Sequence, residues 1–263
     1  MTKHSLINCS TQRDYSMTVN AHGLNRNIPS DVKRQVRQKC GFGCVICGLA
    51  IVQYEHVEPE FKDAKFHDPD SITLLCPQCH AKITTKMWSK ARVKLAMKAP
   101  KCRQIGYTRE FFDFSDKHPA LRFGGMLLKN CPIPIQVGDY PLFSIKPPEN
   151  PGEPYLFSGF FTDSYGAASL VICDNEWQAY SNIWDIEVQG PSITIREKRG
   201  EIHLILRVNP PNEIIVERLK MSLCGISFDA NGDLLKVTYP NGATANFTSC
   251  LADNGQVGLF IAN

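Results

Sequence analysis

Residues 40–48 read Cys-Gly-Phe-Gly-Cys-Val-Ile-Cys-Gly, and residues 76–80 read Cys-Pro-Gln-Cys-His. These two stretches contain two C-x-x-C pairs, formed by Cys44, Cys47, Cys76 and Cys79. Each pair supplies two sulfurs at the reach that Zn–S bonds of about 2.3 Å require, so four thiolates can surround one tetrahedral zinc. The sequence therefore predicts a closed, structural zinc site that holds this part of the chain together.

An acid and two imidazoles that the zinc does not need lie close to these cysteines in the sequence. They are Glu55, His56 and His80. A carboxylate and an imidazole can hold a second divalent cation, and such an ion can activate a bound water. One short region thus combines a structural metal site with candidate catalytic residues.

The composition is that of a globular protein. With 263 residues, 43% of them hydrophobic and 21% charged, the chain is long enough to form one or two domains. The first 28 residues are polar, and no later stretch approaches the roughly 18 apolar residues of a membrane span. We therefore expect a soluble, cytoplasmic protein without membrane contact. In that reducing compartment the eleven cysteines indicate metal binding and free thiols instead of disulfides.

The charge is distributed unevenly along the chain. Residues 1–110 hold 18 Lys and Arg against 9 Asp and Glu, whereas the remainder holds 11 against 17. A basic region suits a polyanion, because each neutralised phosphate releases condensed counterions. The asymmetry predicts two parts with different partners.

The chain after the polar leader predicts a helix followed by two strands. Ser30 is a candidate N-cap for a helix that ends at Gly41 and Gly43. Strand-like runs at residues 51–57 and 72–75 lie on either side of a charged loop.

A second helix is predicted from Cys79 to Lys98, because this stretch contains good helix formers and neither Gly nor Pro. Its lysines recur every fourth residue, beside an apolar stripe formed by Ile83, Met87, Ala91 and Leu95. No acid occurs from Ala81 to Thr108. We interpret the lysine stripe as a phosphate-binding surface; a solvated helix flank is the alternative.

The character of the sequence changes near residue 130, where prolines cluster and exclude helices. Strand-like runs follow at residues 168–172, 192–195, 201–208, 213–217 and 234–239. The turn signals at residues 230–233 and 240–242 predict hairpins. We expect an all-β region, which is a sandwich, a barrel or a short β-helix.

These features together make the N-terminal third of the chain resemble the HNH endonucleases. This branch of the ββα-metal nucleases has a fold that is held by a zinc ion on two C-x-x-C knuckles. The resemblance covers about residues 29–88, and its carriers are residues 40–48, Tyr-Glu-His-Val at 54–57, and the stretch 68–84. It implies an α+β protein, with an N-terminal ββα-metal (HNH) domain and its structural zinc followed by a mainly β domain.

The resemblance also implies roles for individual residues. His56 corresponds to the general base, and Glu55 and His80 correspond to ligands of a catalytic ion, Mg²⁺ or another divalent ion such as Mn²⁺ or Ni²⁺. The family's middle asparagine is replaced here by Ser71, preceded by Asp70, and both are candidates for bracing the loop that bears the base.

The implied activity is hydrolysis of phosphodiester bonds in double-stranded DNA, with RNA as a possible substrate. The products expected from the resemblance carry a 5′-phosphate and a 3′-hydroxyl. We expect backbone contacts to come from Lys82, Lys86, Lys90, Lys94 and Arg37. Such contacts position a nucleic acid without reading its sequence.

The expected organisation is a polar leader over residues 1–28, a nuclease domain over 29–104, a linker over 105–130 and a β-rich domain over 131–263. Because the β-rich part is acidic, we interpret it as a regulatory or sensing domain, or as a surface for a partner protein or a second copy of the chain.

The cysteine pairs allow two other interpretations. A non-catalytic zinc ribbon that binds nucleic acid or protein is the main alternative, and in it Glu55 and His56 are incidental. The C-x-x-C-H run at residues 76–80 also matches a haem-attachment site, but covalent haem requires export and leaves the first pair unexplained. We interpret His67, in the loop between the strands, as a residue without a chemical role; assistance to the metal or a contact with DNA is the alternative.

Overall fold

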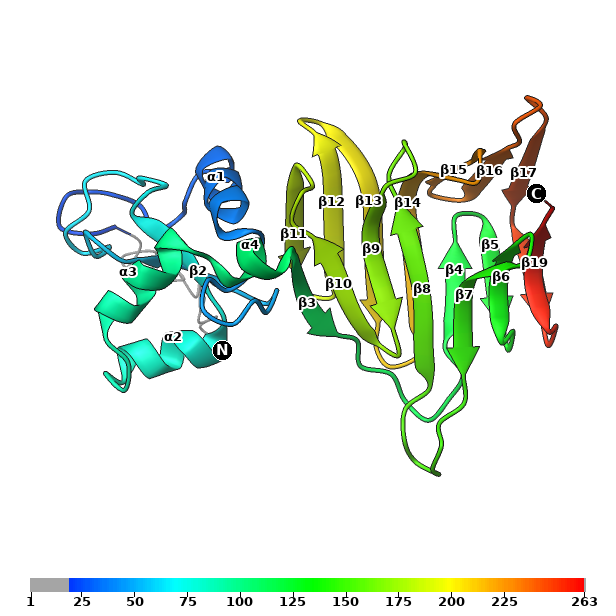
Figure 1. Ribbon diagram of the computed structural model, residues 1–263, viewed down its shortest axis with the longest axis horizontal. Coiled ribbons are helices and arrows are strands. Elements are labelled where there is room, and N and C mark those ends of the chain that lie inside the picture. The colour runs from blue at the N-terminus through cyan, green and yellow to red at the C-terminus, as the bar shows by residue number, and fades with distance from the viewer. Residues whose placement is uncertain (1–18, 263) are drawn as a thin grey trace, which may run out of the picture.

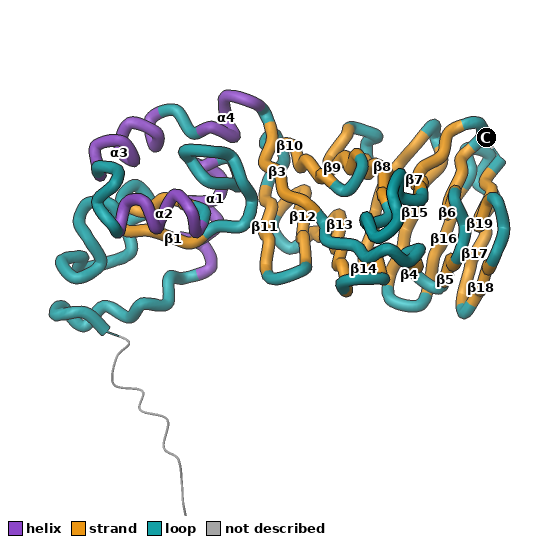
Figure 2. The backbone as a smooth tube through the Cα atoms, turned by 90° about the horizontal axis from the view of Figure 1, so that it is seen from below, coloured by secondary structure: helices purple, strands orange, loops and turns teal. Residues whose placement is uncertain are grey.

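A computed structural model describes residues 19–262, so most of the predicted leader lies outside the described residues. The described chain is a mixed α+β structure made mostly of β-sheet. Its helices gather at one end and two large sheets form the rest (Figures 1 and 2). None of the helices between residues 19 and 262 combines the length and apolarity that crossing a bilayer needs.

The first helix, α1, spans Ser30–Cys40 and ends as the sequence predicts. Gly41 follows it with φ 71°, a left-handed conformation that favours glycine. The predicted N-cap is wrong by one residue, because Pro29 occupies the cap position and Ser30 is already helical. Proline restricts the backbone of its own residue at this boundary, so no side-chain cap is needed to set the start.

The two predicted strands form an antiparallel hairpin. Strand β1 spans Gln53–His56 and β2 spans Ile72–Leu75, with Glu55 opposite Thr73. Helix α2, Pro77–Thr84, begins directly after β2. Its proline stands at the start of the helix, where a missing N–H costs nothing.

The single helix predicted from Cys79 to Lys98 is wrong. The chain instead forms α2, α3 (Lys90–Lys98) and a short α4 (Lys101–Ile105). Lys86 has φ 62°, and the Ser89 side chain caps α3 by accepting from the Arg92 amide. Because the break changes the helix phase, the predicted apolar stripe does not form: Met87 is 72% exposed, whereas Val93 is buried.

The β-rich part contains two sheets. The smaller sheet has the order β19 (Val257–Ile261), β6 (Ile133–Val137), β7 (Tyr140–Lys146), β8 (Leu156–Thr162), β9 (Ala168–Cys173), β10 (Glu176–Tyr180) and β3 (Tyr107–Phe111). The larger sheet has the order β11 (Asp185–Gln189), β12 (Ser192–Lys198), β13 (Glu201–Asn209), β14 (Glu213–Leu223), β15 (Ile226–Asn231), β16 (Leu234–Thr238) and β17 (Thr244–Thr248). It also includes β4 (Ala120–Phe123), β5 (Met126–Lys129) and β18 (Cys250–Asp253).

One hydrophobic core joins the two sheets. It contains Phe143 and Phe161 from the smaller sheet and Leu206 and Val216 from the larger one, all fully or almost fully buried. Of the alternatives that the sequence left open, the arrangement corresponds to two sheets packed on a shared core. The predicted turns at residues 230–233 and 240–242 do connect antiparallel neighbours, β15 with β16 and β16 with β17.

The segment predicted as a linker, residues 105–130, is part of the sheets. It contains β3, which pairs with β10, and β4 and β5, which belong to the larger sheet. The helical part also packs directly on the β-rich part, because Phe42 and Ala50 belong to the core of the latter. The Ala50 amide donates to the Arg109 carbonyl at 3.0 Å.

A buried ion-pair network closes the same junction. The Arg37 guanidinium of α1 contacts the Asp185 carboxylate of β11 with N–O distances of 2.7 and 2.9 Å. Arg196 of β12 contacts the same carboxylate at 3.0 Å, and Glu187 accepts from both arginines. Arg37 also donates to the hydroxyl of Tyr54, the residue before Glu55 on β1.

Candidate functional site

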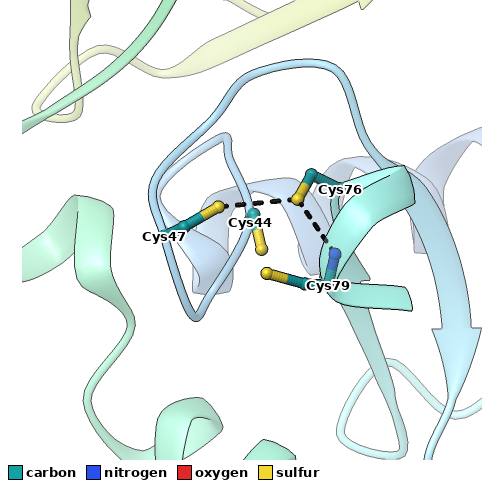
Figure 3. A group of neighbouring side chains, drawn as sticks. All are labelled: Cys44, Cys47, Cys76 and Cys79. Carbon is teal, nitrogen blue, oxygen red and sulfur yellow. Dashed lines mark hydrogen bonds between the residues drawn. The ribbon is translucent and has the colours of Figure 1, made fainter. Parts of the chain in front are cut away.

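The two C-x-x-C pairs converge. Cys44 and Cys47 lie in the loop after α1, and Cys76 and Cys79 lie at the start of α2 (Figure 3). The four sulfurs are all within 4.8 Å of one another, and those of Cys47 and Cys76 are 3.5 Å apart. Tetrahedral zinc with bonds of about 2.3 Å places its sulfurs about 3.8 Å apart. The four cysteines could therefore hold a metal such as zinc.

Backbone hydrogen bonds shape the first knuckle. The Cys44 amide donates to the Leu49 carbonyl at 2.8 Å, and the Gly48 amide donates back to the Cys44 carbonyl at 2.8 Å. Glycine is required at position 43, because a Cβ there would lie 2.7 Å from the Cys102 sulfur. A hydrogen bond from the Cys47 thiol holds the pKa of Cys44 well below its usual value, which favours the thiolate that metals bind.

Glu55 and His80 are brought together by β1 and α2. Glu55 Oε2 and His80 Nε2 are 3.1 Å apart, and the side chains are 28% and 32% exposed. The two residues are separated by 25 positions in the sequence. The hairpin thus places a carboxylate next to the imidazole of the helix that follows it.

His56 follows Glu55 on β1 and is 8% exposed. It lines a cleft of about 340 Å³ together with Glu55. The basic side chains of Arg26, Lys62 and Lys90 also line this cleft, as does Glu60, which pairs with both lysines. The pKa of His56 is lowered, first by burial and then by the nearby His67 and Arg26. A lowered pKa keeps the imidazole neutral near pH 7, which is the form that can accept a proton.

His67, which we interpreted from the sequence as a residue without a chemical role, contacts His56. His67 Nδ1 lies 3.1 Å from His56 Nε2, and His67 Nε2 lies 2.8 Å from the Asn25 carbonyl oxygen. Arg26 is a second cleft residue that the sequence analysis missed, and its guanidinium lies 5.0 Å from the centre of the Phe61 ring. The first contact depends on how the loop folds onto β1, and the second on how the segment before α1 folds against that loop, so no local sequence signal predicts either.

The loop between β1 and β2 is held by Asp68 and Ser71. The Ser71 carbonyl accepts from the Val57 amide at 2.9 Å, directly after His56, and the Ser71 hydroxyl donates to the Asp68 carboxylate at 2.9 Å. The Asp70 side chain pairs with Lys39 instead. Of the two predicted brace residues, Ser71 contacts the chain next to His56, and Asp70 does not.

The predicted lysine stripe is divided by the break between α2 and α3. Lys82 lies 4.5 Å from the ring centre of Trp88, and Lys86 is exposed in the connection. Lys90 pairs with Glu60 and Lys94 pairs with Glu58, so acids from the loop after β1 accompany the lysines of α3.

Arg37 is not on the surface. It is 7% exposed and its guanidinium is paired with Asp185 and Glu187, so the structure places it at the junction with the β-rich part. The sequence analysis assigned Arg37 to the basic surface because its partner, Asp185, is 148 residues away in the sequence.

A comparison of the chain with protein-family models, with curated proteins and with solved structures finds no match.

Proposed function

We propose that the protein is a metal-dependent HNH endonuclease that hydrolyses phosphodiester bonds in double-stranded DNA. One observation carries the proposal: the carboxylate of Glu55 and the imidazole of His80 meet at 3.1 Å, and the nearly buried His56 follows Glu55 on β1. His56 and Glu55 also share a cleft that basic side chains line. The chain order supports the same interpretation: a hairpin is followed by a helix, with one cysteine pair before the hairpin and the other at the start of the helix.

In this proposal the four cysteines bind a structural zinc ion. Its sulfurs come from two segments that are far apart in the sequence, and closed thiolate sites of this kind stabilise folds without leaving a position for substrate. A zinc bound there would fix the start of α2, and with it His80, against the loop after α1. The zinc therefore positions the site without taking part in the chemistry.

The pair of Glu55 and His80 fits a second ion. Adjacent ligands of an octahedral ion with bonds of about 2.1 Å lie about 3.0 Å apart, close to the observed 3.1 Å between Oε2 and Nε2. Without an ion, the same distance is that of a hydrogen bond. When bound, such an ion would polarise the scissile phosphate and stabilise the charge that develops on the leaving oxygen.

His56 would act as the general base. Its neutral imidazole takes a proton from water, and the water oxygen forms a bond to phosphorus. The bond from phosphorus to the 3′ oxygen breaks, its electron pair stays on that oxygen, and solvent supplies the proton that completes the 3′-hydroxyl. Arg26 lines the cleft and would offset the phosphate charge. Lys62 and Lys90 would do the same once the phosphate replaces Glu60, the acid of the cleft that pairs with both.

The nucleic acid would be held mainly through its backbone. Lys82 and Lys86 extend the basic surface beyond the cleft, on and after α2. The lysines of α3 are paired with Glu58 and Glu60, but exposed ion pairs of this kind contribute little and can exchange for phosphates. We leave Arg37 out of this surface because it is buried.

A plasmid assay tests the proposal. The full chain is incubated with supercoiled DNA and Mg²⁺, Mn²⁺ or Ni²⁺, and nicking is expected with at least one of these ions. His56→Ala should lower the rate by about 10²- to 10⁴-fold, the usual worth of a general base. The bound zinc should remain near one per chain. His22→Ala, at an exposed histidine, is the matched control and should cut like the unchanged protein.

Two results of this assay would overturn the proposal. DNA binding without cutting under all three ions would favour the non-catalytic zinc ribbon. Equal rates for His56→Ala and the unchanged protein would show that the cutting comes from elsewhere. Competition by RNA, measured in the same assay, decides which nucleic acid is preferred.

A further inference from the structure

His56 and His67 form a chain of hydrogen bonds that ends on a backbone carbonyl. His56 Nε2 lies 3.1 Å from His67 Nδ1, and His67 Nε2 lies 2.8 Å from the Asn25 oxygen. These distances are those of hydrogen bonds between nitrogen donors and their acceptors. The chain connects the proposed base to a segment that precedes α1.

The carbonyl at the end of this chain fixes where the protons lie. A carbonyl oxygen only accepts, so the hydrogen of a neutral His67 must be on Nε2. Nδ1 of His67 then carries a lone pair, and His56 must donate to it through Nε2. A neutral imidazole has one N–H, so the lone pair of His56 is on Nδ1.

The remaining nitrogen of His56 is free to act. Nδ1 has no hydrogen-bond partner among the described residues, and it is not one of their buried unpartnered atoms. His56 lines the basic cleft, so a water in the cleft can reach that nitrogen. The hydrogen bond to His67 therefore selects the His56 tautomer whose Nδ1 can accept a proton.

We propose that His67 is a positioning residue that holds His56 in the tautomer with its lone pair on Nδ1, and that Nδ1 is the atom that accepts the proton of the attacking water. This inference rests on the proposed nuclease function for its catalytic part. The tautomer itself does not depend on that function.

The segment that carries Asn25 is tied to the loop that carries His67. The Asn20 side chain donates to the carbonyls of Phe61 and Ala64, at 2.5 and 2.6 Å. Val19 and Asn25 also form an isolated bridge, which closes this segment on itself. Because both ends of the hydrogen-bond chain are anchored, the ring of His67 is oriented before any substrate arrives.

The same contact stabilises the base after it has reacted. When Nδ1 of His56 takes a proton, the ring becomes a cation, and the bond from Nε2–H to His67 becomes charge-assisted. His67 thus accepts the hydrogen bond from His56 and stabilises the charged form of His56 that proton transfer creates. Its loss should therefore lower kcat and leave DNA binding almost unchanged.

Nitrogen NMR of the zinc-loaded full chain, labelled with ¹⁵N-histidine, tests the tautomer directly. At a pH well above the usual histidine pKa of about 6.5, His56 should show a bare Nδ1 and a protonated Nε2. The signal is assigned by its loss in His56→Ala. In His67→Leu, which has no acceptor, the two tautomers should mix, whereas His67→Asn keeps an acceptor oxygen near the Nδ1 position and should preserve the tautomer.

Plasmid nicking by the same variants tests the catalytic part. His67→Leu should lower kcat by about 10- to 100-fold, less than the loss of the base itself, and His67→Asn should recover most of the rate. KM for DNA should stay within about twofold, since the phosphate contacts remain. Zinc content and thermal melting, measured on each variant, show whether the fold is intact. His22→Leu, at an exposed histidine, is the control.

The outcomes separate this inference from the proposed function. A protonated Nδ1 on His56, or a tautomer that does not change in His67→Leu, overturns the inference even if the protein cuts DNA. An unchanged kcat in a folded His67→Leu also overturns it. If the unchanged protein does not cut DNA but shows the expected tautomers, the proposed function fails and the hydrogen-bond assignment stands.

Discussion

The helical part and the β-rich part are stabilised in different ways. In the helical part, the buried cluster is small, and all four knuckle residues lie in or against it. In the β-rich part, two sheets share an extended apolar core with stacked and tilted aromatic rings, such as those of Phe143, Phe157 and Phe161. We therefore expect the first part to depend on an ion bound by the cysteines, whereas apolar burial holds the second.

The candidate site lies in the part with the smaller apolar core. Glu55 and His80 are partly exposed and paired with each other, so placing them there costs the fold little. The β-rich part anchors the helical part at the junction, because Asp185 is buried there and Phe42 packs into the core of the β-rich part. The following predictions test this division.

The largest effect is expected from loss of the zinc. Removal of the ion by a strong chelator, or Cys44→Ser, should unfold the helical part, because structural zinc contributes roughly 10 kcal/mol or more to folding. Circular dichroism should lose its helical component, and limited proteolysis should leave the β-rich part intact. Retention of the helical signal in the metal-free protein would contradict the comparison.

A smaller effect is expected from Phe143→Ala in the β-rich part. Phe143 is fully buried against three other phenylalanines, so the free energy of unfolding should fall by about 3–5 kcal/mol. Denaturant unfolding measures this change. Phe260→Ala, at a 58% exposed phenylalanine, is the matched control and should change little. Equal changes in unfolding free energy at Phe143 and Phe260 would contradict the claim that the core between the two sheets stabilises the β-rich part.

The junction should respond to Asp185→Leu. This change leaves Arg37 buried with only Glu187 as a charged partner, and removal of one member of a buried pair costs about 3 kcal/mol. The double variant Arg37→Met with Asp185→Leu should recover much of that loss, because both partners are then apolar. Thermal melting of the unchanged protein, the two single variants and the double variant gives the coupling free energy between Arg37 and Asp185.

Truncation of the chain at residue 110 would test the junction less well, because it cuts β3.

The smallest effect concerns the pH dependence of the β-rich part. Burial lowers the pKa of His203, whose ring contacts the Ser169 hydroxyl and the Lys220 carbonyl. The unfolded chain, with a histidine pKa of about 6.5, binds a proton that the folded chain rejects. Stability should therefore fall as the pH drops below about 6.5, by at most about 1.4 kcal/mol per pH unit.

His203→Gln isolates this contribution. The variant should lose the part of the acid sensitivity that comes from this histidine, as measured by urea unfolding at several pH values. A variant as acid-sensitive as the unchanged protein would assign the effect to other groups.

The features that the sequence predicts well are local ones. The C-x-x-C spacing confines each pair of sulfurs whatever surrounds it, and Asn-Gly turns specify hairpins over a few residues. The strand Ile72–Leu75 has the bounds predicted for it because its four residues, three of them apolar and one a threonine, are buried in succession, and isoleucine and threonine favour strands. Local chemistry was sufficient for these elements.

The features that the sequence does not predict depend on distant partners. From the sequence alone Arg37 looks like a surface residue, because nothing local indicates its ion pair with Asp185. His67 contacts His56 only because its loop folds onto β1. The break before α3 depends on Ser89, a signal that good helix formers on both sides obscure. Propensity and periodicity carry no information about such long-range contacts.

The central claim is that the cysteine cluster holds the fold and that Glu55, His56 and His80 use a different ion to cut DNA. The most direct test uses protein with one zinc per chain that has been freed of loosely bound ions. Such protein should not nick a plasmid until Mg²⁺, Mn²⁺ or Ni²⁺ is added, and His56→Ala with the same zinc content should stay inactive after the addition. Cutting that needs no added ion, or that His56→Ala performs equally well, would contradict the account.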